Sequence, residues 1–315
     1  MIAYANPAPV SLRARLLRLA IRWTIGRAMQ SLAPPDTQRR QLLRAGALVK
    51  WLAARGAQAQ VDTLAGLPTI TVRPRAAVAA AREAHLLYLH GGGYVVGAAS
   101  LYVSMTTRLS RLTGACVHLP DYRLAPEHPF PAAVDDALAA YRALLDQGVP
   151  ASRIVIGGDS AGGGLTLACA LAARDAGLPQ PAGLICYSPW TDLTVSGASV
   201  RGNAATELVL DPSHTERYVG AYLPAGMDAR TPLASPLFAD LRGLAPIFIQ
   251  VAAQEVLLDD STRLAEAAQQ AGVPTEIEIW NGVWHVWQAM PVILPEADAA
   301  LARTAAFMRR VWGLR

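Results

Sequence analysis

The chain is poor in lysine and cysteine and has no long apolar run. Lys50 is its only lysine, and a phosphate-binding P-loop requires a lysine directly before its serine or threonine, so that class of nucleotide site is excluded. Cys116, Cys169 and Cys186 lie far apart in apolar surroundings without metal-ligand spacing, which predicts buried free thiols and no metal. No run of 18 uninterrupted apolar residues occurs, so no membrane-spanning helix is expected.

The N-terminal segment does not have the pattern of a signal peptide. Arg13, Arg15, Arg18 and Arg22 interrupt its apolar residues before they form a core of useful length. We therefore expect a soluble, cytoplasmic protein.

Positive charge is concentrated at the N-terminus. Residues 1–56 carry ten basic residues and one acid, a net charge of +9, which leaves −5 for the other 259 residues. Such a segment could contact a membrane or an acidic partner, but we favour the solvated face of two amphipathic helices packed on a larger body. We expect no nucleic-acid binding and no stable membrane association, and the sequence leaves a homodimer open.

The rest of the sequence alternates between strand and helix patterns. With 52% hydrophobic and 17% charged residues, the chain can bury a large core. After helical patterns at about 11–32 and 38–56 and a hairpin near 61–74, alternation predicts an α/β fold with a mostly parallel sheet between helices. The expected strands are 85–89, 115–119, 153–157, 183–187, 246–252 and 275–280; the expected helices are 100–113, 131–146, 161–176, 259–271 and 295–312. Residues 190–235 fit the alternation poorly and are interpreted as an insertion, partly helical at 213–222.

The segment Gly158-Asp159-Ser160-Ala161-Gly162 joins a β-branched strand directly to an apolar helix. It matches the G-x-S-x-G pattern, in which a sharp turn exposes the serine hydroxyl at the carboxyl edge of a sheet. Glycine permits the positive φ and the close backbone approach that such a turn needs. The pattern predicts that Ser160 is a catalytic nucleophile.

A serine nucleophile needs a histidine base and a carboxylate that orients it. In this type of fold both follow the serine, which leaves His214 and His285 as candidates for the base. His285 follows the last predicted strand, whereas His214 lies in the insertion and is expected at the surface. Glu255 is the first carboxylate after the strand at 246–252, and it is preferred to Asp259, which is better placed to begin a helix.

Amide donors for a developing oxyanion are expected from two places. The nucleophile turn supplies the N–H of Ala161, and the glycine-rich segment after the strand at 85–89 supplies those of Gly91 and Gly92. His90 is expected to brace this segment. Tyr94, Trp284 and Trp287 flank the predicted catalytic residues and are candidates for substrate binding, with burial in the core as the equal alternative.

Several segments together resemble the hormone-sensitive-lipase-like branch of the α/β-hydrolases, which contains the bacterial family IV esterases. They are HGGGY at 90–94, DYRLAPEHPFPAAVDD at 121–136, GDSAGG at 158–163, EVLLDD at 255–260 and WH at 284–285. The resemblance spans about residues 60–312 and implies the α/β-hydrolase fold. It also implies a helical cap from residues 1–56 and an insertion at about 190–235, on a catalytic domain of residues 57–315.

For the site, the resemblance implies Ser160 as nucleophile, His285 as base, and Gly91, Gly92 and Ala161 as oxyanion donors. The family's acid motif usually begins with Asp where this chain has Glu255. Arg123 and Glu127 in the DYRLAPE segment are expected to be ion-paired scaffold.

The resulting hypothesis is a carboxylesterase that cleaves small-molecule esters of short- to medium-chain acids through a Ser-His-Glu triad and an acyl-enzyme, without a cofactor. A lactonase or amidase with the same triad, and a non-catalytic receptor for small ligands on the same scaffold, are the alternatives.

Overall fold

The structure is a computed structural model that describes residues 2–4, 10–53, 58–74 and 84–314. These residues contain one nine-stranded sheet in the order β1-β9-β8-β7-β6-β4-β5-β3-β2. Within this order, each pair of neighbours among β1, β9, β8, β7, β6, β4 and β5 is parallel. The last two strands, β3 and β2, pair antiparallel with their neighbours. The strands are β1 (Ile2–Tyr4), β2 (Gln58–Leu64), β3 (Leu67–Arg73), β4 (His85–Leu89), β5 (Cys116–Pro120), β6 (Ile154–Asp159), β7 (Gly183–Tyr187), β8 (Ile247–Ala252) and β9 (Thr275–Trp280).

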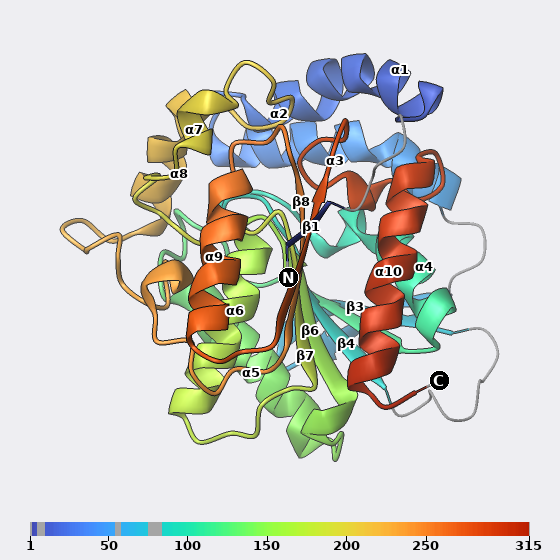
Figure 1. Cartoon of the computed structure of the whole chain (residues 1–315), viewed down its shortest axis with the longest axis vertical. Helices are drawn as coiled ribbons and strands as arrows, with labels where there is room; N and C mark the ends of the chain where they lie inside the picture. Colours follow the sequence, from blue (N-terminus) through green and yellow to red (C-terminus); the bar gives the residue numbers. More distant parts are fainter. Residues whose placement is uncertain (1, 5–9, 54–57, 75–83, 315) are drawn as a thin grey trace.

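Helices cover both faces of this sheet, as Figure 1 shows, with α5, α6 and α9 on one face and α4 and α10 on the other. The α-helices are α1 (Leu12–Ile21), α2 (Arg27–Met29), α3 (Pro35–Ala53), α4 (Val103–Thr113), α5 (Ala132–Asp146), α6 (Ala161–Asp175), α7 (Ser199–Gly202), α8 (Thr215–Tyr222), α9 (Leu258–Gln270) and α10 (Pro295–Val311). The short turns η2 (Ala99–Leu101), η3 (Ala151–Arg153), η4 (Pro212–His214), η5 (Pro236–Phe238) and η6 (Trp287–Ala289) are 3₁₀-helical, and η1 (Arg22–Gly26) is π-helical.

The alternation of strands and helices is as the sequence predicts, and this confirms the α/β fold. The expected hairpin is β2–β3, whose turn residues Ala65 and Gly66 both have positive φ, as a two-residue hairpin turn requires. Strand β1 was not predicted: residues 2–4 pair in parallel with β9 and extend the sheet, so residues 1–56 are not entirely helical. The predicted boundary at 56–57 lies outside the described residues.

The N-terminal helices and the insertion lie together above the carboxyl edge of the sheet (Figure 1). The helix expected over 11–32 is divided into α1, η1 and α2. At Gly26 a β-carbon would come within 2.2 Å of the Leu208 carbonyl oxygen, so this position lets the helix pack directly on the insertion backbone. Further contacts join the two segments: Arg217 donates to the carbonyls of Ser31 and Ala33.

The core is built to hold the site's loops. One apolar cluster fills the face under α5, α6 and α9, and a second fills the face under α4 and α10. A third joins α1 to the segment after β9 through residues such as Ala14, Ile21, Trp280 and Trp284. Among the helices in the described ranges, none is long and apolar enough to cross a membrane.

Candidate active site

Ser160 lies at a tight turn between β6 and α6. Its φ of +54° and ψ of −123° place it in a strained region for a residue with a side chain. The turn needs glycine on both sides, because a β-carbon on Gly158 would lie 2.2 Å from the Gly162 carbonyl oxygen and one on Gly162 would lie 2.0 Å from the Leu89 carbonyl oxygen. The backbone is fixed by hydrogen bonds from the Ser160 amide to Tyr187 and from the Trp190 amide to the Ser160 carbonyl. The predicted strand–turn–helix geometry is therefore present.

His285 and Glu255 come from the loops after β9 and β8 and are in direct contact. Glu255 Oε2 lies 2.5 Å from His285 Nδ1, while Oε1 accepts from the Ser188 hydroxyl at 2.7 Å and the Ala252 amide at 2.6 Å. Asp259, the competing acid, instead accepts from the Ser199 amide. Glu255 is 2% exposed, so these three donors replace the water that its carboxylate would otherwise bind.

The surroundings of His285 favour its protonated form. Burial opposes the positive charge, but the hydrogen bond and charge of Glu255 outweigh it and raise the pKa of the imidazole. Glu207 and Asp159 add to this effect through their negative charge. Glu207 was missed by the sequence reasoning: its Oε1 accepts the Leu208 and Val209 amides and its Oε2 accepts the Val256 amide, so it ties the insertion to the loop that carries Glu255.

The glycine-rich loop after β4 reaches the nucleophile turn, but the amide of Gly91 is not placed as predicted. The Gly91 amide donates to Asp159 Oδ1 at 3.1 Å and is therefore already used. Within the described residues, no protein acceptor takes the amides of Gly92, Gly93 or Ala161. Gly92 and Gly93 line the cavities that contain Ser160, whereas Gly91 lines neither of them. Gly93 thus joins Gly92 and Ala161 as a candidate donor, and the prediction of Gly91 as a donor conflicts with its hydrogen bond to Asp159.

Asp159 connects the glycine-rich loop to the turn. Besides the Gly91 amide, it accepts the hydroxyls of Tyr88 and Tyr102, each at 2.8 Å. Burial raises the pKa of this carboxyl to about 6, against the effect of its hydrogen-bond donors. The loop is braced further by His90, whose Nδ1 lies 2.8 Å from the Gly91 carbonyl oxygen and whose ring stacks on Tyr122.

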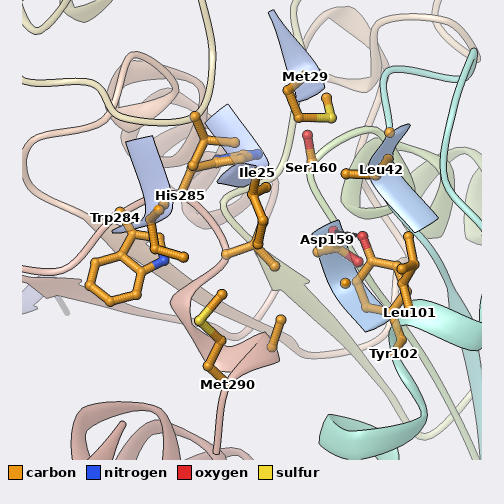
Figure 2. Close-up of a pocket in the computed structure, with 16 residues that line it drawn as sticks. Ile25, Met29, Leu42, Leu101, Tyr102, Asp159, Ser160, Trp284, His285 and Met290 are labelled. Atoms are coloured by element: carbon orange, nitrogen blue, oxygen red, sulfur yellow. Dashed lines mark hydrogen bonds between the residues drawn. The ribbon is translucent and has the colours of Figure 1, made fainter. Parts of the chain in front are cut away.

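A cavity of about 110 Å³ opens beside Ser160 and His285 (Figure 2). One wall belongs to the catalytic domain and includes Gly92, Tyr102 and Trp284. The opposite wall comes from the N-terminal helices and the insertion, through Ile21, Ile25, Met29, Leu42 and Val209. The two sequence-distant segments therefore enclose an apolar space over the nucleophile.

A second, smaller cavity shares Ser160 with the first and extends under the insertion. It is lined by Gly93, His214, Tyr218 and the buried carboxyl of Asp260, among others. The expectation that His214 lies at the surface is wrong: it is half-buried, and none of the described residues forms a hydrogen bond with its Nδ1. Its position in the fold, rather than any sequence motif, brings it to this cavity.

The three aromatic candidates separate into one cavity residue and two core residues. Trp284 lines the larger cavity. Tyr94 is 1% exposed and stacks on Tyr222 of α8 at 3.8 Å, and Trp287 is fully buried in the cluster beneath the His285 loop. Neither Tyr94 nor Trp287 lines either of the two cavities at Ser160, so their expected contact with substrate is corrected to packing.

Arg123 and Glu127 are both ion-paired, as expected of scaffold. Arg123 forms a bidentate pair with Asp136, while Glu127 pairs with Arg39 of α3. The second pair connects the N-terminal helices to the catalytic domain.

Comparison with known proteins places this geometry in a family. A family model described as the alpha/beta hydrolase fold matches residues 86–289. An acetyl-hydrolase of Streptomyces hygroscopicus is 47% identical over 228 residues, covering 72% of this chain and 76% of its own, and an ethyl acetate hydrolase of Pseudomonas putida is 36% identical, covering 75% and 76%. A solved esterase from the bacterial hormone-sensitive lipase family superposes with a TM-score of 0.90 at 38% identity, over 97% of this chain and all of its own. The chain therefore belongs to the α/β-hydrolase family, within its hormone-sensitive-lipase-like esterases.

Proposed function

We propose that the protein hydrolyses carboxylic esters of short- to medium-chain acids through Ser160, His285 and Glu255. The observation that carries the proposal is the 2.5 Å contact between Glu255 and His285 beside a cavity that also contains Ser160. A carboxylate that holds Nδ1–H leaves Nε2 free to accept a proton, which is what a serine nucleophile requires.

The reaction begins when an ester binds with its carbonyl oxygen toward the amides of Gly92, Gly93 and Ala161. His285 takes the Ser160 proton as Oγ attacks the carbonyl carbon, and the tetrahedral oxyanion is held by these amides. Collapse of this intermediate breaks the ester bond, and His285 gives the proton to the departing alcohol. Water then attacks the acyl-enzyme with His285 again as base, which releases the acid and restores Ser160.

The size of the cavity supports a short acyl group. At about 110 Å³ it is somewhat smaller than an apolar cavity of about 150 Å³ that holds benzene. Away from Asp159, Ser160 and His285, its walls are largely Ile, Leu, Met and Trp side chains, which gain free energy from contact with an alkyl chain. Acyl chains of about four to six carbons should fill it, and the names of the acetyl-hydrolase and ethyl acetate hydrolase relatives are consistent with this.

We also propose a cytoplasmic location, supported by three free and buried cysteines.

The test is a series of p-nitrophenyl esters from acetate to dodecanoate, run beside lactones and anilides on the wild type and Ser160→Ala. We expect kcat/KM to be highest near four to six carbons and the variant to lose turnover while keeping its thermal unfolding transition. Faster cleavage of lactones or anilides than of any ester would replace the esterase by the alternatives. Near-native hydrolysis by Ser160→Ala would refute the nucleophile.

A further inference from the structure

A cluster of metal-ligating side chains lies on the sheet far along the strands from the active site. His85 begins β4 and is in register with Cys116, the first residue of β5, while His118 lies two residues further on the same face. His85 Nδ1 and His118 Nε2 are 3.0 Å apart. One donor atom from each of the three residues lies within 4.8 Å of the others.

The two imidazole nitrogens are slightly closer together, at 3.0 Å, than in a tetrahedral metal site, and the cluster as a whole spans up to 4.8 Å. With metal–nitrogen bonds of about 2.0–2.1 Å and a metal–sulfur bond of about 2.3 Å, donor atoms lie roughly 3.3–3.6 Å apart. A bound ion would therefore require the two imidazole nitrogens to move a few tenths of an ångström apart and the sulfur to lie closer to them.

We propose that His85, Cys116 and His118 bind a divalent transition-metal ion of the zinc type. Two imidazoles and a thiolate are ligands that zinc prefers, and three protein ligands leave a fourth position for water. Binding releases the thiol proton to solvent as the sulfur–metal bond forms. Because the ligands lie at the beginning of β4 and β5, whereas the glycine-rich loop follows the end of β4, the ion would cross-link strands rather than act on the ester.

The charges around the cluster act in opposite directions. Arg73 and the neighbouring imidazole of His85 both disfavour a positive charge on His118. Arg73 also repels the ion, whereas Asp62, which acts electrostatically on Cys116 and His118, attracts it. Arg73 is exposed, so its replacement tests the site without disturbing the core.

The test is titration of the untagged, chelator-treated full chain with Co²⁺, followed by competition with Zn²⁺. We expect one equivalent of Co²⁺ to produce thiolate-to-cobalt charge-transfer absorption, which Zn²⁺ abolishes. Cys116→Ala should remove this absorption, His85→Ala should weaken Co²⁺ binding at least tenfold, and Arg73→Gln should tighten it about two- to fivefold. Cys169→Ala, which removes another buried thiol, is the matched control. No such absorption in the wild type, or its persistence in Cys116→Ala, would overturn the proposal.

An independent observation concerns the outer face of the N-terminal helices. Leu12, Leu16, Leu19 and Trp23 are 70%, 63%, 67% and 69% exposed. Their spacing of four, three and four residues places them on one side of α1 and its continuation, at the periphery of the molecule in Figure 1. Monomeric proteins rarely expose four large apolar side chains in a continuous stripe, and such stripes mark interaction surfaces.

The charge beside this stripe identifies what it contacts. Residues 12–29 contain five arginines and no acid. A symmetric contact with a second copy would bring two such sets of arginines together, which like-charge repulsion opposes. An anionic lipid surface instead attracts them, and it accepts leucine and tryptophan at its boundary.

We infer that the stripe docks this protein on an anionic bilayer. This revises the expectation of no stable membrane association, because that expectation assumed that the apolar residues of the helices face the protein. The same helical segment places Ile21 and Ile25 on the cavity beside Ser160, so docking would hold that cavity close to the lipid boundary.

Vesicle flotation tests this, with phosphatidylcholine vesicles that contain or lack phosphatidylglycerol. We expect the chain to float only with the anionic vesicles, to dissociate at high salt, and to lose about tenfold in binding in Leu16→Ser. Val61→Ser is the matched control, because Val61 is 86% exposed on β2, outside the stripe. Trp23 is 69% exposed, so its fluorescence should shift to the blue on binding. Equal binding to both vesicles, no binding, or concentration-dependent dimers without binding would overturn the inference.

Discussion

Replacing Glu255 by glutamine tests the hydrogen bond between residue 255 and His285, because a glutamine side chain has nearly the same size as a glutamate. The carboxylate accepts three hydrogen bonds, two at Oε1 from Ser188 and Ala252 and one at Oε2 from His285. A glutamine has one acceptor oxygen, and the two donors on one side fix it there. Its NH₂ group then faces His285 Nδ1, which can only accept, so the ring proton moves to Nε2 and the ring can no longer take the Ser160 proton.

The expected loss follows from that tautomer. An analogous carboxylate-to-amide change in a serine protease costs about 10⁴ in kcat, which corresponds to roughly 5.5 kcal/mol of transition-state stabilisation. The pH profile should also change. Because Glu255 raises the pKa of His285 and the base must be neutral, wild-type activity falls as pH drops through that pKa; without the negative charge, the acid limb moves to lower pH.

The assay is pH-stat titration of ethyl butyrate hydrolysis, whose readout does not depend on a chromophore. Asp259→Asn is the matched control, because Asp259 accepts from the Ser199 amide, whereas Glu255 is the carboxylate at His285 Nδ1; the variant should stay within a few-fold of wild type. A Glu255→Gln enzyme within tenfold of wild type, or with an unmoved acid limb, would refute the assigned acid.

Three further changes test the surroundings of the nucleophile. Gly93→Ala should lower kcat by about 10²–10³ without unfolding the chain. The φ of Gly93 is +61° and a β-carbon there would lie 2.6 Å from the Tyr218 ring, so the substitution should displace the amide that is proposed to bind the oxyanion. Steady-state kinetics and a thermal melt measure the two effects. His214→Leu should reduce kcat/KM about two- to tenfold for monobutyrin but not for ethyl butyrate, since only the glycerol hydroxyls can bind the unpartnered Nδ1. Gly26→Ala should raise KM more than it lowers kcat, because its β-carbon meets Leu208 and moves the N-terminal helix; an unchanged KM across the ester series would contradict this.

The sequence predicted best what depends on local chain geometry. The turn at Ser160 follows from glycines that a β-carbon would exclude, and the positions of Glu255 and His285 follow from the strands that precede them. Parallel strands bring their carboxyl ends to one edge, so Ser160 and His285, which are 125 positions apart, could be assigned to one site. The preference for Glu255 over Asp259 rested on the distance of each from β8 and on the suitability of Asp259 to begin a helix.

The errors concern which way a side chain or amide points in space. The HGGG segment alone could not predict which glycine amides are available, because the Gly91 amide donates to Asp159, which lies on the neighbouring strand β6. Tyr94 and Trp287 lie next to site residues in sequence, yet the backbone turns both into the core. Strand β1 has only three residues and is stabilised by pairing with β9, far along the chain, so no local pattern predicts it. The His85–Cys116–His118 cluster likewise exists only through strand pairing.

In the proposed reaction, the groups that carry out the chemistry and those that select the acyl chain come from different parts of this chain, and this limits what each substitution should change. The three proposed catalytic side chains stand on loops of a sheet buried between helices, and their hydrogen bonds are made almost entirely within the catalytic domain. The apolar wall opposite them belongs to the N-terminal helices and the insertion, which contact the domain through pairs such as Arg39–Glu127. Substitutions in that wall alter the ground-state fit of an acyl chain and leave the proton path in place, so they should act on KM and chain-length preference. Glu207 is the exception, because it hydrogen-bonds both the insertion and the loop of Glu255, and Glu207→Gln should therefore change KM and the acid limb together.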